Sequence, residues 1–212
     1  MDFQDTPEEA AFRAEARDWL AANAPAFACD HATGYTDETI VKARAWQARK
    51  AQAGYAAFTW PEGKGGAGGG PVRQVIFEDE QRAFPLPINM AFMSVDVVLP
   101  ALFAHARPDQ YEPHIAPALN GETFWCELFS EPSGGSDASA FRTRAERDGD
   151  AYVLNGQKCW NSYADWADWG VIVVRTDPTV PKHKGLSLFM LDLRSPGVEI
   201  RPIKQMNGFS EY

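Results

Sequence analysis

Apolar residues in the first half of the chain recur at helical spacing. Residues 6–9 read Thr-Pro-Glu-Glu, in which the threonine and the second glutamate form a capping box and proline opens the first turn. Behind this start, Phe12, Ala16, Trp19 and Leu20 fall on one helical face. The same period, with glycine stops and proline starts, predicts helices over residues 7–22, 37–53, 71–84, 88–106 and 108–119.

The pattern changes near Gly121, where short apolar runs replace the helical period. An Asp-Gly-Asp turn at 148–150 joins two of these runs into a hairpin, because Asp-Gly supplies the positive φ of a tight turn. The predicted strands cover residues 124–130, 143–147, 151–155, 171–175, 186–193 and 198–203.

Helices followed by strands predict an α+β fold. We expect an all-helical domain over residues 1–121 and a mostly antiparallel, barrel-like or sandwich β domain over residues 122–212. The order disfavours a doubly wound nucleotide-binding fold, since that fold alternates strands with helices.

Composition narrows the function classes. The 212 residues are 45% hydrophobic and 23% charged, as in an ordinary globular protein, and the net charge of −9 disfavours binding to nucleic-acid phosphates. No apolar run approaches the roughly 20 residues that span a bilayer. The first residues also lack the basic and apolar segments of a signal peptide.

The cysteines and histidines indicate a reduced, cytoplasmic protein without a metal site. The three cysteines form no CxxC pair, and the four histidines lie at no metal-ligand spacing from other ligands. These residues are Cys29, Cys126, Cys159, His31, His105, His114 and His183.

Two conspicuous motifs are interpreted as ordinary loops. Residues 63–68 fit the spacing GxGxxG, but proline and glutamate rather than a strand precede them, and Pro71 starts the next helix. We interpret this segment as a flexible interhelical loop. The basic run Lys182-His183-Lys184 is interpreted as a solvated loop.

Two segments of the β half are candidates for chemistry. A polar turn with adjacent glycines follows the first predicted strand over residues 131–137, and such glycines let a ligand approach the backbone closely. A plain surface turn is the equal alternative. Residues 155–162 end in Trp160, Asn161 and Ser162, an indole beside a hydroxyl that suits a flat heteroaromatic ring; a core tryptophan is the alternative.

In their order along the chain, these segments resemble the acyl-CoA dehydrogenase family. The N-terminal half contributes Gly54, Trp60-Pro61-Glu62 and the Gly65-Gly66 loop. The β half carries the resemblance through the segments 129–137, 142–145, 148–150, 154–160 and 181–185, which read FSEPSGGSD, RTRA, DGD, LNGQKCW and PKHKG.

The resemblance implies a helical domain, a middle β domain, a C-terminal four-helix bundle and an FAD cofactor. By motif, Phe129 and Ser130 match residues at the flavin pyrimidine, Trp160 the aromatic over the isoalloxazine, and Ser162 the hydroxyl near flavin N5. Gly135 and Ser136 match the turn that lines the approach of the acyl-CoA or of the flavin phosphate.

The implied reaction is α,β-dehydrogenation of an acyl-CoA thioester from a fatty acid or a steroid side chain. A glutamate takes the Cα proton, flavin takes the Cβ hydride, and electrons pass to an electron-transfer flavoprotein. The resemblance also implies a homo- or hetero-oligomer.

The main departure from the family is that no residue here matches the motif of the catalytic base or the bundle. Glu127 and Glu131 are poor substitutes, because Glu131 matches a structural turn position. We therefore expect a truncated chain with an incomplete β domain, inactive by itself. The alternatives are a non-catalytic partner subunit of a hetero-oligomeric flavoenzyme, and a relative of the acyl-CoA oxidases or flavin monooxygenases.

Overall fold

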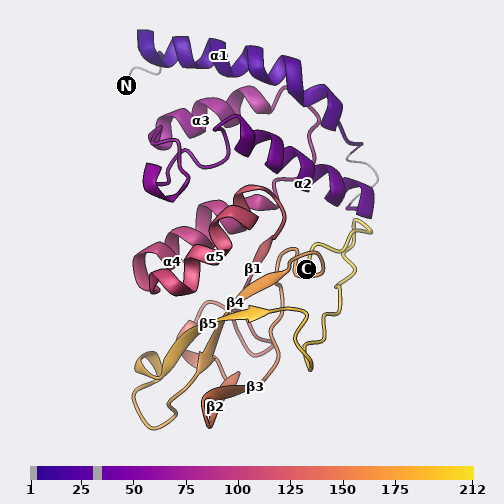
Figure 1. The fold of residues 1–212 in the computed structure, drawn as a ribbon. Coiled ribbons are helices and arrows are strands. Elements are labelled where there is room, and N and C mark those ends of the chain that lie inside the picture. Colours follow the sequence, from indigo (N-terminus) through magenta and orange to yellow (C-terminus); the bar gives the residue numbers. More distant parts are fainter. Residues whose placement is uncertain (1–3, 31–34) are drawn as a thin grey trace. The chain divides into compact units, whose positions relative to one another are not determined.

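The computed structural model of the chain describes residues 4–30 and 35–212. It divides into two compact units, Met1–Thr123 and Phe124–Tyr212, the first helical and the second built on a sheet (Figure 1). The predicted α+β class is confirmed. Two parts of the sequence analysis fall outside the described residues. One is residues 1–3, the start of the segment that lacks signal-peptide character, and the other is His31.

The helical unit follows the predicted order of helices. Its α-helices are α1 (Pro7–Asn23), α2 (Asp37–Gln52), α3 (Gly70–Gln81), α4 (Leu99–His105) and α5 (Pro108–Leu119). The described residues of this unit also form short 3-10 turns, η1 (Ala24–Phe27) and η3 (Glu62–Lys64), and a π-helical segment, η4 (Met93–Val98).

The first helix begins as the sequence predicts. Thr6 accepts the Glu9 backbone N–H and Glu9 accepts the Thr6 backbone N–H, at 3.3 and 2.7 Å, so both donors of the capping box are satisfied. Of the predicted stripe, Phe12, Ala16 and Leu20 are buried and Trp19 is partly buried. The stripe packs into a core with Trp46, Phe58, Ile76, Phe77 and Leu86.

The helix predicted over 88–106 forms only in part: the helical run begins at Ala91, passes through the π-helical segment η4 and continues as α4. Residues 85–89 are irregular, and a π-helical turn, η4, precedes the α4 helix. Pro100 is the physical reason, because it lacks an N–H and its ring clashes with the carbonyl four residues earlier. The backbone before Pro100 widens into the π turn instead of continuing as an α-helix.

The glycine-rich segment lies between η3 and α3, as predicted, but it is a packed loop rather than a flexible one. The Gly66 N–H donates to the Pro61 carbonyl at 3.2 Å, and the Ala67 N–H donates to the Ala57 carbonyl at 3.2 Å. A Cβ on Gly66 would lie 2.0 Å from the Trp60 carbonyl oxygen. Glycine is therefore required here by close backbone packing rather than by a phosphate.

The second unit is a five-stranded sheet. Its strands are β1 (Trp125–Leu128), β2 (Arg144–Asp148), β3 (Ala151–Asn155), β4 (Trp169–Arg175) and β5 (Leu186–Asp192), with short 3-10 turns η5 (Ala138–Ala140) and η6 (Lys182–Lys184). The β2–β3 hairpin turns at Gly149, whose φ is 60°, as the Asp-Gly signal predicts.

The sheet is mixed: most of its paired residues are antiparallel, as predicted, but it also contains parallel pairing. Central strand β4 pairs antiparallel with β5 along its length, and parallel with β1 and with the start of β2. A central strand is buried on both faces, which explains the continuous apolar run Val171–Val174. Local sequence does not reveal which strands pair in parallel.

The strand predicted over 198–203 is absent among the described residues. Its last residue pairs instead with the last residue of the chain: Ile203 N–H donates to the Tyr212 carbonyl at 2.6 Å. Just beyond the segment, Gln205 N–H donates to the Phe209 carbonyl at 2.8 Å. Pro202 removes a ladder donor within the segment, so an apolar run there does not become a regular strand.

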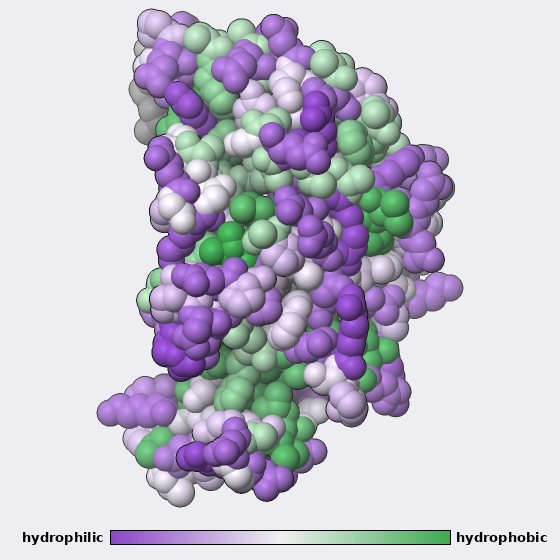
Figure 2. All heavy atoms as spheres, in the orientation of Figure 1, coloured by the Kyte–Doolittle hydropathy of each residue, from purple (hydrophilic) through white to green (hydrophobic). Residues whose placement is uncertain are grey.

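Hydrophilic residues dominate the face drawn in Figure 2, with hydrophobic residues in smaller groups between them. Among the residues that the structure describes, no helix has both the length and the apolar character to cross a membrane.

Candidate functional site

The first candidate segment is a turn that leaves the end of β1. Glu131 and Gly134 exchange backbone hydrogen bonds at 3.0 and 2.9 Å, which closes the turn directly after Ser130. A Cβ on Gly135 would lie 2.9 Å from Ser130 Oγ, so a residue without a side chain lets the turn fold over that hydroxyl. Ser136 is exposed on the same turn.

The second candidate segment follows β3 and lies against the first. The Cys159 N–H donates to the Ser130 carbonyl at 2.9 Å. A Cβ on Gly156 would lie 2.7 Å from Thr143 Cα, so this glycine permits close approach of the loop to the backbone before β2. The structure therefore brings Phe129, Ser130 and the Trp160 loop together, although they lie about thirty residues apart in sequence.

Trp160 presents its indole outward. Its backbone has a φ of 61°, the left-handed region that bulky residues rarely adopt, and 61% of the residue is exposed. The Tyr212 ring meets it edge-on, with ring centroids 6.2 Å apart. An exposed indole on a strained backbone contradicts the alternative of a core tryptophan and is typical of a ligand contact.

Trp160 lines a groove of about 1180 Å³ in the sheet unit. Many of the other lining residues are apolar or aromatic. They include Leu128, Tyr152, Leu154, Leu191, Val198, Ile200 and Tyr212. Phe129, Ser130 and Ser162 are half-buried beside the groove rather than part of its lining, and Gly135 and Ser136 lie on the exposed turn.

Glu131, a possible substitute base, has both carboxylate oxygens engaged. One accepts the Arg142 N–H at 2.7 Å, and the other accepts the Thr143 N–H at 2.8 Å and the Lys158 ammonium at 2.9 Å. Burial alone raises the pKa of this carboxyl, but the two backbone N–H groups and Lys158 outweigh it and hold the pKa at about 2. A carboxyl group with so low a pKa stays ionised and serves to hold the local structure; it does not act as a base.

Glu127, the other possible substitute, lies on the wrong side of β1. Successive side chains of a strand point to opposite faces, and its neighbour Leu128 lines the groove with Trp160. Glu127 therefore points away from the groove. Burial raises the pKa of its carboxyl.

Lys158 is a functional candidate to which the sequence motifs assign no role. Its side chain is 6% exposed, and it donates to the Phe129 carbonyl and to Glu131. The segment Leu154–Trp160 reads LNGQKCW and is mostly polar, so no local pattern indicated that this lysine is buried.

The basic run Lys182–Lys184, predicted to be a solvated loop, forms the exposed 3-10 turn η6. Lys182, His183 and Lys184 are exposed, and the Lys182 carbonyl accepts from Arg175 at 3.1 Å. The part of the chain that the structure describes holds no group of three or more residues arranged to bind a metal ion.

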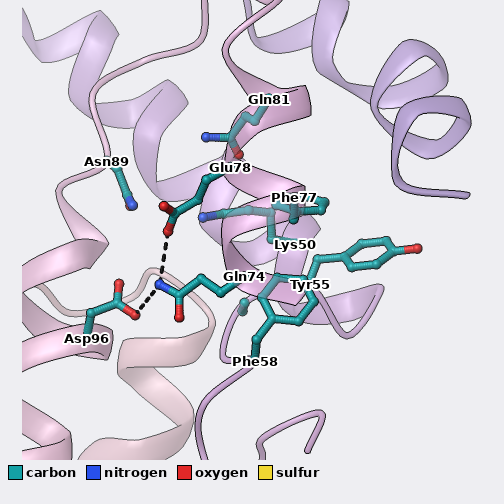
Figure 3. Close-up of a pocket in the computed structure, with 10 residues that line it drawn as sticks. Lys50, Tyr55, Phe58, Gln74, Phe77, Glu78, Gln81, Asn89 and Asp96 are labelled. Carbon is teal, nitrogen blue, oxygen red and sulfur yellow. Dashed lines mark hydrogen bonds between the residues drawn. The ribbon is translucent and has the colours of Figure 1, made fainter. Parts of the chain in front are cut away.

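A second, much smaller cavity of about 30 Å³ lies in the helical unit, which is room for about one water molecule. Figure 3 shows Gln74 between two acidic side chains, donating to Glu78 at 2.9 Å and to Asp96 at 3.0 Å. Lys50 lies beside them and is buried. Burial lowers the pKa of its amine to about 8, although Asp96 and Glu78 oppose this shift.

Lys50 is expected to make stability depend on alkaline pH. Unfolded, its pKa returns to 10.5, so between about pH 8 and 10.5 the unfolded chain binds more protons than the folded chain. The free energy of unfolding then rises with pH, by about 3 kcal/mol over this range. Urea unfolding of the wild type, Lys50→Met and the exposed control Lys182→Met measures it. The rise should vanish in Lys50→Met alone; an equal rise in all three proteins contradicts the assignment.

Family models match both units. The model described as "Acyl-CoA dehydrogenase, N-terminal domain" matches residues 6–122, and the model described as "Acyl-CoA dehydrogenase, middle domain" matches residues 126–212.

Individual relatives agree with these matches. Acyl-CoA dehydrogenase IpdE1 of Mycobacterium tuberculosis is 37% identical over 99% of this chain and 54% of its own length. A solved structure described as "Tcur3481-Tcur3483 steroid ACAD" superposes with a TM-score of 0.80 at 28% identity, over 99% of this chain and 54% of that one. The ChsE4-ChsE5 complex from Mycobacterium tuberculosis gives a TM-score of 0.80 at 30% identity, over 98% and 52%. The chain thus spans about half the length of the relatives it matches.

Proposed function

The chain belongs to the acyl-CoA dehydrogenase family, and we propose that it supplies the N-terminal and middle domains of an FAD-dependent enzyme that dehydrogenates the α,β bond of an acyl-CoA thioester. One observation carries the proposal: the Cys159–Ser130 hydrogen bond joins the two segments that the family uses for flavin, beside an outward indole. The groove next to them is large and lined by apolar and polar groups, as cofactor sites are.

The residues present suit a flavin. Trp160 offers an exposed aromatic face for a flat heterocycle, and the Ser130 hydroxyl, with Phe129 beside it, offers a polar contact at the ring edge. Ser162 offers a second hydroxyl, at the position the family uses near flavin N5. Bound FAD supplies the hydride acceptor of the dehydrogenation.

The substrate and the electron acceptor follow from the same proposal. The exposed turn with Gly135 and Ser136 leaves backbone and hydroxyl groups for the approaching acyl-CoA. One solved relative is described as a "steroid ACAD", which supports an acyl chain of steroid character beside ordinary fatty acyl chains. An electron-transfer flavoprotein would accept the electrons.

A second candidate function is a partner subunit that completes a flavin site together with a different chain. The observation that favours it is the similarity to one chain of the ChsE4-ChsE5 complex. Purification of the protein through an N-terminal tag from its own cells distinguishes the two functions. A second family member that copurifies in equal amount supports the partner subunit, and a longer single polypeptide supports the first function.

An oxidase is distinguished by its electron acceptor. With acyl-CoA supplied, a dehydrogenase reduces an artificial dye and consumes little oxygen, whereas an oxidase consumes oxygen without the dye. Oxygen consumption that accounts for the turnover would contradict the proposed dehydrogenase.

Trp160→Ala is expected to weaken retention of FAD by about 10- to 100-fold in the protein purified from its own cells. Stacking of an aromatic side chain on a flat heterocycle is worth about 1–3 kcal/mol, and alanine removes it. Trp160→Phe keeps a ring and should retain most of the affinity.

Ser162→Ala should shift the flavin reduction potential through a lost hydrogen bond of about 0.5–1.5 kcal/mol. Flavin content and potential are measured; unchanged values in every variant would assign both residues to the scaffold.

A further inference from the structure

We propose that the buried Lys158–Glu131 ion pair positions Ser130 and Trp160 for the cofactor, with Lys158 acting as a positioning residue rather than a catalytic one. The inference rests on the flavin site proposed above, and it assigns to this pair the task of holding the two halves of that site together.

Lys158 is bound on three sides. Its ammonium donates to Glu131 Oε1 at 2.9 Å and to the Phe129 carbonyl at 2.8 Å, and it lies 4.3 Å from the centre of the Phe141 ring. The side chains of the pair are 6% and 4% exposed. A buried ammonium is tolerated only where its donors are satisfied, and here carbonyl, carboxylate and ring face satisfy it together.

The contacts converge on the residues that flank the proposed flavin contacts. Phe129 and Glu131 are the neighbours of Ser130, while Ser130 itself accepts the Cys159 N–H at 2.9 Å. Three successive residues directly after β1 are therefore bound to two successive residues of the Trp160 loop. This double attachment fixes the offset between the serine and the indole.

Glu131 extends the attachment to a third segment. Its carboxylate accepts the N–H groups of Arg142 and Thr143, at 2.7 and 2.8 Å, immediately before β2. Hydrogen bonds from backbone N–H groups to a carboxylate are charge-assisted and strong. One buried anion thus connects the turn after β1, the segment before β2 and the loop after β3.

The backbone of Trp160 shows why such an attachment is needed. A tryptophan at a φ of 61° persists only when its surroundings determine the conformation. Cys159, directly before it, is bound to Ser130, and Tyr163, three residues later, donates its N–H to the Glu211 carbonyl at 2.7 Å. If Lys158 releases the start of the loop, Trp160 is free to return to an ordinary φ and the indole turns away.

The test uses Lys158→Met, Glu131→Gln, the conservative variant Lys158→Arg, and the exposed lysine control Lys182→Met. Amide hydrogen exchange is followed at Cys159 and, as a measure of whole-unit stability, at Val174 in β4. Trp160 fluorescence is taken as the difference between each protein and the same protein carrying Trp160→Phe. Neither readout needs a bound flavin.

Lys158→Met and Glu131→Gln are expected to accelerate exchange at Cys159 by at least about tenfold relative to Val174, and to shift the Trp160 emission. Lys158→Arg should restore most of both signals, and Lys182→Met should change neither. Wild-type behaviour in Lys158→Met overturns the proposal. Equal acceleration at Cys159 and Val174 also overturns it, because the pair would then stabilise the unit as a whole.

Flavin binding is measured on the same proteins after purification from their own cells. If the loop signals respond but the wild type holds no FAD, the proposed function fails while the positioning of the loop stands. If the wild type and Lys158→Met hold FAD equally and with the same reduction potential, the positioning role fails while the proposed function stands.

Discussion

The 212-residue chain, expressed by itself, is expected to show no measurable acyl-CoA dehydrogenase turnover. General base catalysis alone is worth about 10²- to 10⁴-fold, and neither glutamate next to the motif is placed to provide it. Dye reduction is measured with straight-chain and steroid acyl-CoA thioesters at saturating FAD, with a family member of full length as the positive control.

The structure explains why neither carboxylate can act as the catalytic base. Glu131 has a pKa of about 2 and holds three hydrogen bonds, so it neither takes up a proton near neutral pH nor reaches a substrate. Glu127 points to the face of β1 opposite the groove residue Leu128. Turnover by the chain alone that disappears in Glu127→Gln would contradict this assignment.

Trp60→Ala is expected to lower the free energy of unfolding by about 3–5 kcal/mol, the range for a large buried aromatic. Trp60 is 2% exposed, its indole N–H donates to the Val95 carbonyl at 2.6 Å, and its ring meets Phe103 at a centroid distance of 5.0 Å. Alanine therefore leaves a cavity and an unsatisfied buried carbonyl. Urea unfolding followed by helical circular dichroism measures the loss.

Two matched variants separate the causes. Trp60→Phe keeps most of the ring and removes the donor, so it should lose less than Trp60→Ala. Val75→Ala removes an exposed side chain from α3 and should change stability by less than about 0.5 kcal/mol. A loss below about 1 kcal/mol in Trp60→Ala would show that Trp60 is not a core residue of the helical unit.

Local signals in the sequence predicted the elements whose causes are local. The capping box of α1, the proline start of α5 and the turn at Gly149 each depend on residues within a few positions of one another. The strand Ala151–Asn155 and the helix Pro108–Leu119 have the predicted bounds. These features formed in the structure because nothing distant competes with them.

Features with distant causes were not predicted. The parallel pairing of β1 with β4 joins Trp125 to Trp169, forty-four residues away, and no local pattern encodes it. The segment 198–203 is apolar enough for a strand, yet the chain end pairs with it instead. The π turn before Pro100 is the exception: its cause is local, and the helical period alone did not reveal it.

The site divides in the same way. The family motifs located Ser130 and Trp160 in sequence, but only the fold shows that the Cys159 N–H reaches the Ser130 carbonyl. The left-handed backbone of Trp160 and the burial of Lys158 are invisible in a linear sequence. Both depend on three segments meeting in space, which hydrophobic periodicity does not describe.

The most direct test of the central claim is the flavin content of the tagged protein purified from its own cells, for the wild type and Trp160→Ala side by side. The account predicts that the wild type holds noncovalent FAD in proportion to the tagged chain, and that Trp160→Ala loses most of it on dilution while remaining folded. A wild-type protein without FAD, or a Trp160→Ala protein that retains FAD as tightly as the wild type, would contradict the claim that this chain forms one face of a flavin site.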